Sequence, residues 1–250
     1  MSALAFQNVM ALLIRFPTDS LEDLQKKLGD PELTSKEQDQ LRQMSVDPLV
    51  RKFGQKMRFS RQRDATKIMR LSKDMITPEV FSSIYLELFE PSQTSINLET
   101  IGIQFIDFCL SDPRALEKLA GEVPYLTDVL RYERARAVTE LDMVRENDPR
   151  LPQGSCLRHP CFQILDFQYD IPAIDRVKVK DPDSRPEPKL KPSKMIFMTV
   201  NEYPYCRIFQ IDQAIESFLT VQLKNPDQWE SALPAAYDGM VKVGLCRPLS

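Results

Sequence analysis

The residues best suited to chemistry are one histidine and two nearby cysteines, Cys156, His159 and Cys161. A thiolate next to an imidazole can be a nucleophile, and the same residue types bind zinc. His159 is the only histidine, so a site built from two or three imidazoles cannot exist within one copy of the chain. The Cys-x4-Cys spacing differs from that of paired zinc knuckles, and His159 directly precedes a proline. We therefore expect a structural or interface role for His159 and small core cysteines.

Other catalytic signatures are missing from the sequence. The seven glycines are isolated, so no phosphate-binding loop or dinucleotide fingerprint is present, and Ser155 and Ser250 lack a glycine elbow. The five cysteines are odd in number, and no apolar run approaches the length of a membrane span. These observations predict a cytoplasmic protein with no intrinsic catalytic site, no bound metal and no membrane association.

Glu133 is a carboxylate that interrupts the apolar stripe of a long predicted helix. It lies one turn after Leu130 and one turn before Ala137, in a long helix expected from Pro124 to about residue 147. A carboxylate in that position must be paired. We predict a structural ion pair with a nearby arginine rather than an acid or base.

A strongly basic segment runs from Arg51 to Lys73, with nine basic residues against Asp64 alone. Its apolar spacing predicts an amphipathic helix or helix pair. Three interpretations stay open: a solvated helix face, a surface for an acidic protein or peptide, and a nucleic-acid interface. Only Phe53 and Phe59 could stack on bases, and the whole chain carries a net charge of −3, so nucleic acid is disfavoured.

The first 150 residues read as helices. Ser20 predicts a helix N-cap, and Thr34 with Glu37 has the spacing of a capping box. A helix is expected to begin at Pro78, and the apolar stretch from Leu98 to Leu110 is expected at the centre of the core. These elements predict an all-α domain over residues 1–150.

The period changes after Pro149. Alternation predicts a strand from Leu165 to Ile171, followed by strands over 195–200 and 205–211 and then three helices that begin after Asp212, at Pro226 and at Pro234. The connection 177–194 holds four prolines and nine charged residues, so we expect it to be exposed. The fold class predicted is α+β, with a small βββααα module over residues 151–250.

The segment from Val123 to Ala135 is similar to the signature PYL-D-x-x-R-x-E-x-A of a bacterial family. Phe81 to Phe89, Ile101 to Phe108, His159-Pro160 and the expected strands continue the resemblance over roughly residues 60–224. The family's name describes a DNA-binding domain. Its better understood members, however, are partner subunits of TIM-barrel multinuclear non-haem iron enzymes, as in the methanobactin and 3-thiaglutamate pathways.

The resemblance implies a heteromeric, dioxygen-dependent complex that modifies a cysteine of a ribosomally made precursor peptide. The iron would lie in the barrel subunit, and this chain would bind the leader and present the cysteine. Carbon excision from a C-terminal cysteine, as in a 3-thiaglutamate pathway, is the favoured reaction. The helical domain would dock on the barrel subunit through Tyr125, Arg131, Glu133 and His159.

The C-terminal module resembles the winged-helix peptide-recognition element of such pathways. There the leader adds as a strand to the third strand, next to the third helix. On this sequence the groove falls between Tyr205 to Ile211 and Pro234 to Val243, with Arg207 facing an acidic leader residue. The peptide-binding residues expected are Tyr205, Arg207, Phe209, Ile211, Tyr237, Met240 and Val241. The alternative is a nucleic-acid-binding or transcriptional regulator that uses segment 51–73.

Overall fold

The computed structural model describes residues 2–16, 19–29, 31–90, 97, 100–141, 162–176, 187–200, 203–224, 234–242, 244 and 246–247. These residues form two compact units. The first comprises Met1–Lys67 with Asn97–Ile101, and the second comprises Ile68–Ile96 with Gly102–Ser250. This division differs from the one expected at residue 150, a position that lies outside the described residues.

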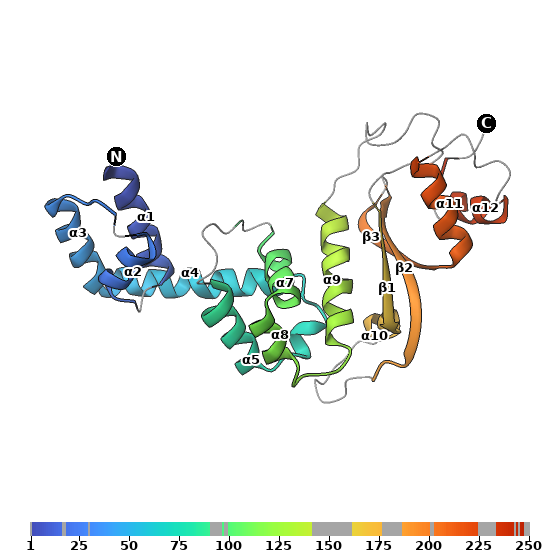
Figure 1. The fold of residues 1–250 in the computed structure, drawn as a ribbon, viewed down its shortest axis with the longest axis horizontal. Coiled ribbons are helices and arrows are strands. Elements are labelled where there is room, and N and C mark those ends of the chain that lie inside the picture. The colour runs from blue at the N-terminus through green and yellow to red at the C-terminus, as the bar shows by residue number, and fades with distance from the viewer. Residues whose placement is uncertain are drawn as a thin grey trace. The chain divides into compact units, whose positions relative to one another are not determined.

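The first unit is helical, with α1 (Ser2–Arg15), α2 (Leu21–Lys27), α3 (Ser35–Val46) and α4 (Pro48–Thr66) (Figure 1). α4 packs against both α1 and α3. The core of the unit holds Leu13, Phe16 and Leu24, which are at most 5% exposed. Burial of these three side chains is what ties α1 and α2 together, because helices this short are unstable alone in water.

The predicted helix starts of this unit are confirmed by their caps. Ser20 Oγ accepts a hydrogen bond from the Asp23 amide at 3.1 Å. Thr34 Oγ1 accepts from the Glu37 amide at 3.3 Å, and the Glu37 carboxylate accepts from the Thr34 amide at 2.8 Å, which completes the capping box. Each cap satisfies an amide that the helix itself leaves without a partner.

In the second unit, the helical part contains η1 (Ser72–Asp74), α5 (Pro78–Ser82), the π-helical η2 (Ser83–Phe89), α8 (Pro113–Leu119), α9 (Leu126–Leu141) and all of α7 (Ile101–Ser111) after its first residue. Phe105 of α7 is fully buried and packs against Phe81, Tyr85 and Phe89 with ring centroids 5.1 to 5.6 Å apart. The expectation that this helix is central to the core is confirmed. It begins at Ile101, three residues later than expected.

A three-stranded antiparallel sheet follows, made of β1 (Phe162–Tyr169), β2 (Leu190–Val200) and β3 (Tyr203–Ile211) in the order β1-β2-β3. α10 (Ile171–Arg176) connects β1 to β2, and α11 (Gln213–Lys224) and α12 (Pro234–Lys242) come after β3. The chain is therefore an α+β protein that is mostly helical. No helix among the described residues has the length and apolar character needed to cross a bilayer.

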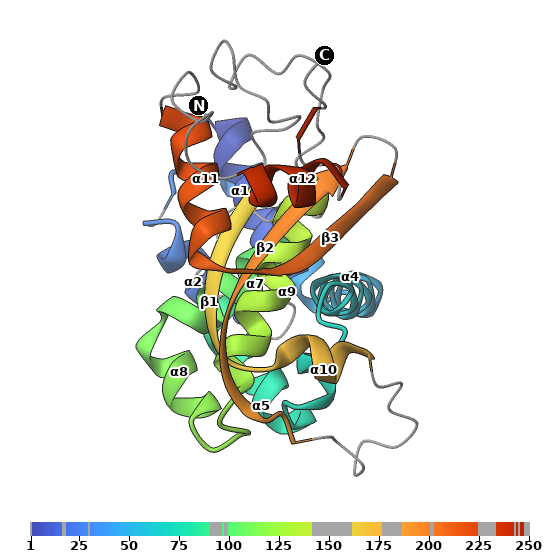
Figure 2. The ribbon, with the colours of Figure 1, turned by 90° about the vertical axis from the view of Figure 1, so that its right-hand side faces the viewer.

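Both faces of the sheet are covered by helices. α9 lies against one face, and α11 and α12 lie against the other (Figure 2). Residues of β2 alternate between these two sides as the pleat requires: Phe197 meets Tyr132 of α9, whereas Ile196 and Met198 join the cluster under α11 and α12. The continuous apolar run of β2 follows from this burial on both faces.

Two sequence predictions about the sheet need correction. Ile171 does not extend β1 but begins α10, because Pro172 has no amide to donate to a ladder. The exposed connection expected to reach residue 194 ends earlier, since β2 already begins at Leu190. Pro192 is accommodated where the register between β1 and β2 is irregular, a position that tolerates proline.

The ends of the C-terminal helices agree with the prediction where they are described. Asp212 accepts from the Ile215 amide at 2.9 Å and caps α11. After α12, Gly244 has a φ of +82°, the left-handed conformation expected of a glycine that ends a helix. The helix expected from Pro226, residues 177–186 and the segment with Cys156, His159 and Cys161 lie outside the described residues.

Candidate functional site

The candidate binding surface is the outer edge of β3 together with the adjoining helix α12. β3 pairs along one side with β2, and it is the last strand in the sheet order of the described residues. An edge strand offers backbone N–H and C=O groups to an added strand. The topology therefore leaves a place for an extended peptide beside β3.

Alternate side chains of β3 face α11 and α12. Arg207 lies opposite Met198 and Phe209 lies opposite Ile196, and these two β2 residues belong to the buried cluster on that side of the sheet. Arg207 is half-buried, and Phe209 is partly buried against the cluster. A peptide added to β3 would run next to these two side chains.

The helix side of the surface is supplied by α12. Tyr237 and Val241 are partly buried and pack against the same cluster as Phe209. The Tyr237 hydroxyl donates a hydrogen bond to the backbone oxygen of Arg247 at 2.7 Å. This bond ties the start of α12 to the chain beyond it and fixes the orientation of the tyrosine ring.

Two of the expected pocket residues belong to the core instead. Ile211 and Met240 are each 6% exposed and form part of the buried cluster with Phe218 and Leu219. Because both side chains are buried between the sheet and the helices, they offer almost no surface to a ligand. Tyr205 lies within β3, and its side chain is outside the description.

Glu133 of α9 has no exposed surface. One carboxylate oxygen accepts from the Leu71 amide at 2.6 Å, and the other accepts from the hydroxyl and, at 3.4 Å, from the amide of Ser72. Burial raises the pKa of Glu133 to about 7, although these donors and Arg136 act in the opposite direction. The predicted structural role stands, but the partners are the start of η1 rather than an arginine ion pair.

The remaining residues expected at a partner interface differ in exposure. Tyr125 is 5% exposed and its ring lies 5.8 Å from that of Tyr169, so, like Glu133, it offers no surface to a partner. Arg131 is partly exposed; its guanidinium lies 3.5 Å from Asp128 and stacks over the Phe167 ring. His159 lies outside the described residues. Of the three that the structure describes, Arg131 is the one at the surface.

Asp128 is a site residue that the sequence reasoning missed. Its carboxylate accepts from the Gln168 amide at 2.7 Å and from the Tyr169 amide at 3.1 Å, while Asp128 is only 6% exposed. These bonds hold the end of β1 on the first turn of α9 at the irregularity in the ladder. The sequence feature that could have predicted this role is an acidic residue two positions after Pro124-Tyr125-Leu126, in the first turn of the expected helix.

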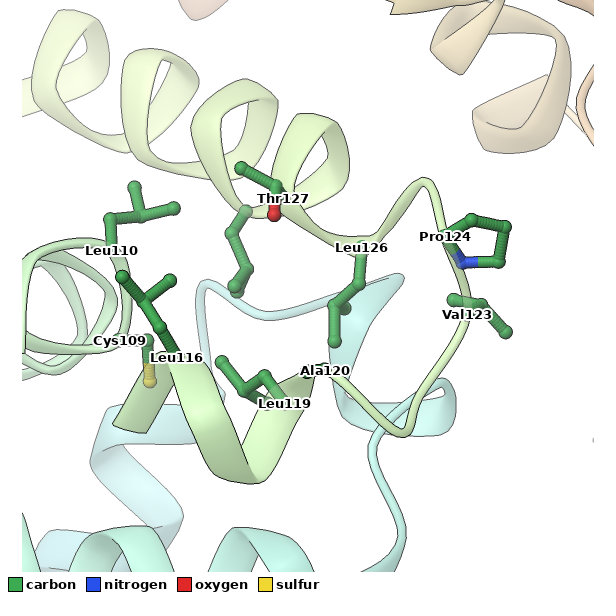
Figure 3. Close-up of a pocket in the computed structure, with 10 residues that line it drawn as sticks. Cys109, Leu110, Leu116, Leu119, Ala120, Val123, Pro124, Leu126 and Thr127 are labelled. Carbon is green, nitrogen blue, oxygen red and sulfur yellow. The ribbon is translucent and has the colours of Figure 1, made fainter. Parts of the chain in front are cut away.

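A small pocket with mainly apolar side chains in its walls lies between α7, α8 and the start of α9 (Figure 3). Its volume is about 250 Å³, and its walls include Cys109, Leu119, Leu126 and Leu130. Burial raises the pKa of the Cys109 thiol to about 12, which keeps the fraction of reactive thiolate small at physiological pH. Thr127 contributes the single side-chain hydroxyl of the wall, which leaves the pocket without an acid or a base.

Two other described groups have pKa values that are raised mainly by burial. The pKa of the half-buried Cys206 thiol is raised to about 12, mainly by burial and then by Glu140. The Tyr132 hydroxyl donates to Asp175 at 3.0 Å, and burial together with this carboxylate raises the pKa of the tyrosine. Among the described residues, no three histidine, cysteine or acidic side chains gather where they could hold a metal ion.

Comparisons with known proteins add no identification, since neither a family model nor a curated protein matches the chain.

Proposed function

We propose that the chain is a non-catalytic subunit of an iron-dependent, peptide-modifying oxygenase. It binds the leader of a ribosomally made precursor and presents the precursor's cysteine to the iron of a TIM-barrel partner. The favoured reaction is carbon excision from a C-terminal cysteine, as in 3-thiaglutamate-type pathways. The iron belongs to the partner subunit, because this chain has one histidine in total.

The observation that carries the proposal is the edge strand β3 with α12 beside it. In this proposal the sheet, α11 and α12 act as a winged-helix-like recognition module. Backbone hydrogen bonds along β3 supply affinity for an extended leader, and side chains set its register. Arg207, Phe209, Tyr237 and Val241 are the side chains assigned to the leader.

A presenting subunit acts by holding the peptide and does not itself need an activated group. Burial raises the pKa of the Cys109 and Cys206 thiols, and both carboxylate oxygens of Glu133 accept hydrogen bonds from Leu71 and Ser72. A subunit of this kind contributes proximity: holding the leader raises the effective concentration of the cysteine at the iron.

The charge of Arg207 gives the first test. We expect Arg207→Glu to weaken binding of a synthetic leader, taken from the precursor encoded beside this chain, by about three- to tenfold, because an attraction to an acidic leader residue becomes a repulsion. Fluorescence anisotropy with the labelled leader measures the change. The matched control is Arg70→Glu at an exposed position, which should leave the affinity as it is. Equal affinities for both variants would place the groove elsewhere.

Strand addition has its own signature in the backbone of the peptide. N-methylation of alternate leader residues removes the amides that would donate to β3, and we expect it to reduce affinity at least tenfold. Methylation of the intervening residues should have a much smaller effect, because their amides point away from the strand. If methylation of the alternate residues and of the intervening residues reduces the affinity equally, strand addition is ruled out.

The complex itself is tested by co-expression with an adjacent iron-enzyme gene and its cysteine-containing precursor, followed by metal analysis and peptide mass. The proposal requires that this chain co-purifies with the iron subunit and that the mass change of the precursor depends on it. A barrel subunit that makes the same product without this chain would contradict the proposal.

A further inference from the structure

The outer face of α4 is exposed and carries both cations and large apolar side chains. Leu49 is 75% exposed, Phe53 51% and Phe59 72%. Lys52, Lys56 and Arg63 are exposed on the same helix. Gly54 and Ala65, the buried residues of α4, lie on the opposite side, where the helix packs against α1 and α3.

The spacing places these residues on one surface. Lys52, Lys56, Phe59 and Arg63 follow one another at intervals of four, three and four residues, which is the spacing of one helix face. At about 100° per residue, the three cations fall between Phe59 on one flank and Leu49 with Phe53 on the other. We call the surface made by these six residues the α4 face.

The α4 face has no negative charge of its own. Asp64, the one acidic residue of α4, lies about 20° beyond Phe53 around the helix axis; it is only partly exposed, and its charge is paired with Lys67 at 2.7 Å. Within the described part of the chain, none of Lys52, Lys56 and Arg63 forms an ion pair with a carboxylate. A solvated helix face would not need three large apolar side chains among its charges.

We propose that the α4 face binds an acidic amphipathic segment of a partner protein, with carboxylates over the central cations and apolar side chains over the flanking Leu49, Phe53 and Phe59. Charge complementarity selects this occupant. A helix that enters a bilayer keeps its cations at the edges of an apolar face, whereas here the cations occupy the centre. Nucleic acid would neutralise the cations but would leave Leu49 uncovered.

This interaction is separate from the leader-binding surface, because all six residues lie in the first compact unit and β3 lies in the second. Failure of the proposed leader binding would therefore leave the α4 face unaffected, and the reverse also holds.

The test is selection from a phage-displayed library of random 16-residue peptides on the full-length chain. Expected are sequences that combine acidic residues with leucine or phenylalanine at helical spacing. Their affinity should fall at least tenfold with Lys52→Glu/Lys56→Glu and, independently, with Phe53→Ser/Phe59→Ser. Matched controls are Lys26→Glu/Lys36→Glu and Leu4→Ser, exposed positions of the same unit, which should keep the affinity within twofold.

Two further probes separate the alternatives: a 20-base-pair DNA duplex and vesicles of phosphatidylserine with phosphatidylcholine. The proposal holds if both bind at least tenfold more weakly than the selected peptides at 150 mM salt. It is overturned if the selected peptides lack acidic residues, if they bind the Lys52→Glu/Lys56→Glu variant equally well, or if duplex or vesicles bind as tightly as the peptides and lose binding in the same variants.

Discussion

Replacing Phe197 with alanine is expected to lower the free energy of unfolding by about 3–5 kcal/mol, because it removes a fully buried ring and leaves a cavity. Phe197 lies in the middle of β2, with its ring centroid 5.4 Å from that of Tyr132 and 6.0 Å from that of Phe167. It therefore takes part in the contact between α9 and the sheet. Chemical denaturation followed by tryptophan fluorescence and circular dichroism measures the loss.

The matched control lies on the same strand. Leu190 is 70% exposed, so Leu190→Ala should change the free energy of unfolding by no more than about 0.5 kcal/mol. Phe197→Leu keeps part of the apolar volume and should fall between the two. If Phe197→Ala proves as harmless as Leu190→Ala, the packing of α9 on this face of the sheet is not as described.

Sequence patterns were most informative where the determinant is local. The caps at Ser20, Thr34 and Asp212 were predicted because an N-cap bonds an amide two or three residues away. β1 and β2 were recognisable from their patterns of apolar residues. Alternation indicates a strand with one buried face, and a continuous apolar run indicates a strand that is buried on both faces. The basic helix was likewise predicted, and α4 confirms it.

Long-range pairing was the part that sequence could not supply. The need of Glu133 for a partner was clear, but its donors, Leu71 and Ser72, lie more than sixty positions away and give no signal of their own. Long-range packing also decided which of the expected groove residues are buried in the core and which keep exposed surface. Phe209 and Ile211 alternate identically along β3, yet only Ile211 becomes core, because the helices above the sheet decide which neighbour they cover.

A further large effect is expected in the pH dependence of stability at Glu133. Its pKa is raised from an ordinary value of 4.5 to about 7 in the folded chain, because the carboxyl is buried. Below about pH 4.5 both the folded and the unfolded states hold the proton. Between that pH and about 7 the unfolded state has released the proton while the folded state keeps it, so stability falls as the pH rises and then levels off.

Glu133→Gln removes this titration. The predicted quantity is the free energy of unfolding of the parent minus that of the variant. We expect this difference to fall by up to about 3 kcal/mol between pH 4.5 and pH 8, at about 1.4 kcal/mol per pKa unit. Urea denaturation at a series of pH values measures the difference. Glu117→Gln, on the exposed side of α8, is the matched control and should follow the parent at every pH.

The sign of the slope distinguishes two accounts of the same contacts. If burial dominates, ionisation of the carboxyl destabilises the folded state, and the free energy of unfolding of the parent falls relative to that of Glu133→Gln as the pH rises. If the amides of Leu71 and Ser72 and the Ser72 hydroxyl outweigh burial, the parent gains instead, since each is a stronger donor to a charged acceptor. A flat or rising difference would therefore contradict the raised pKa and would mean that η1 is held by an ionised Glu133 at neutral pH.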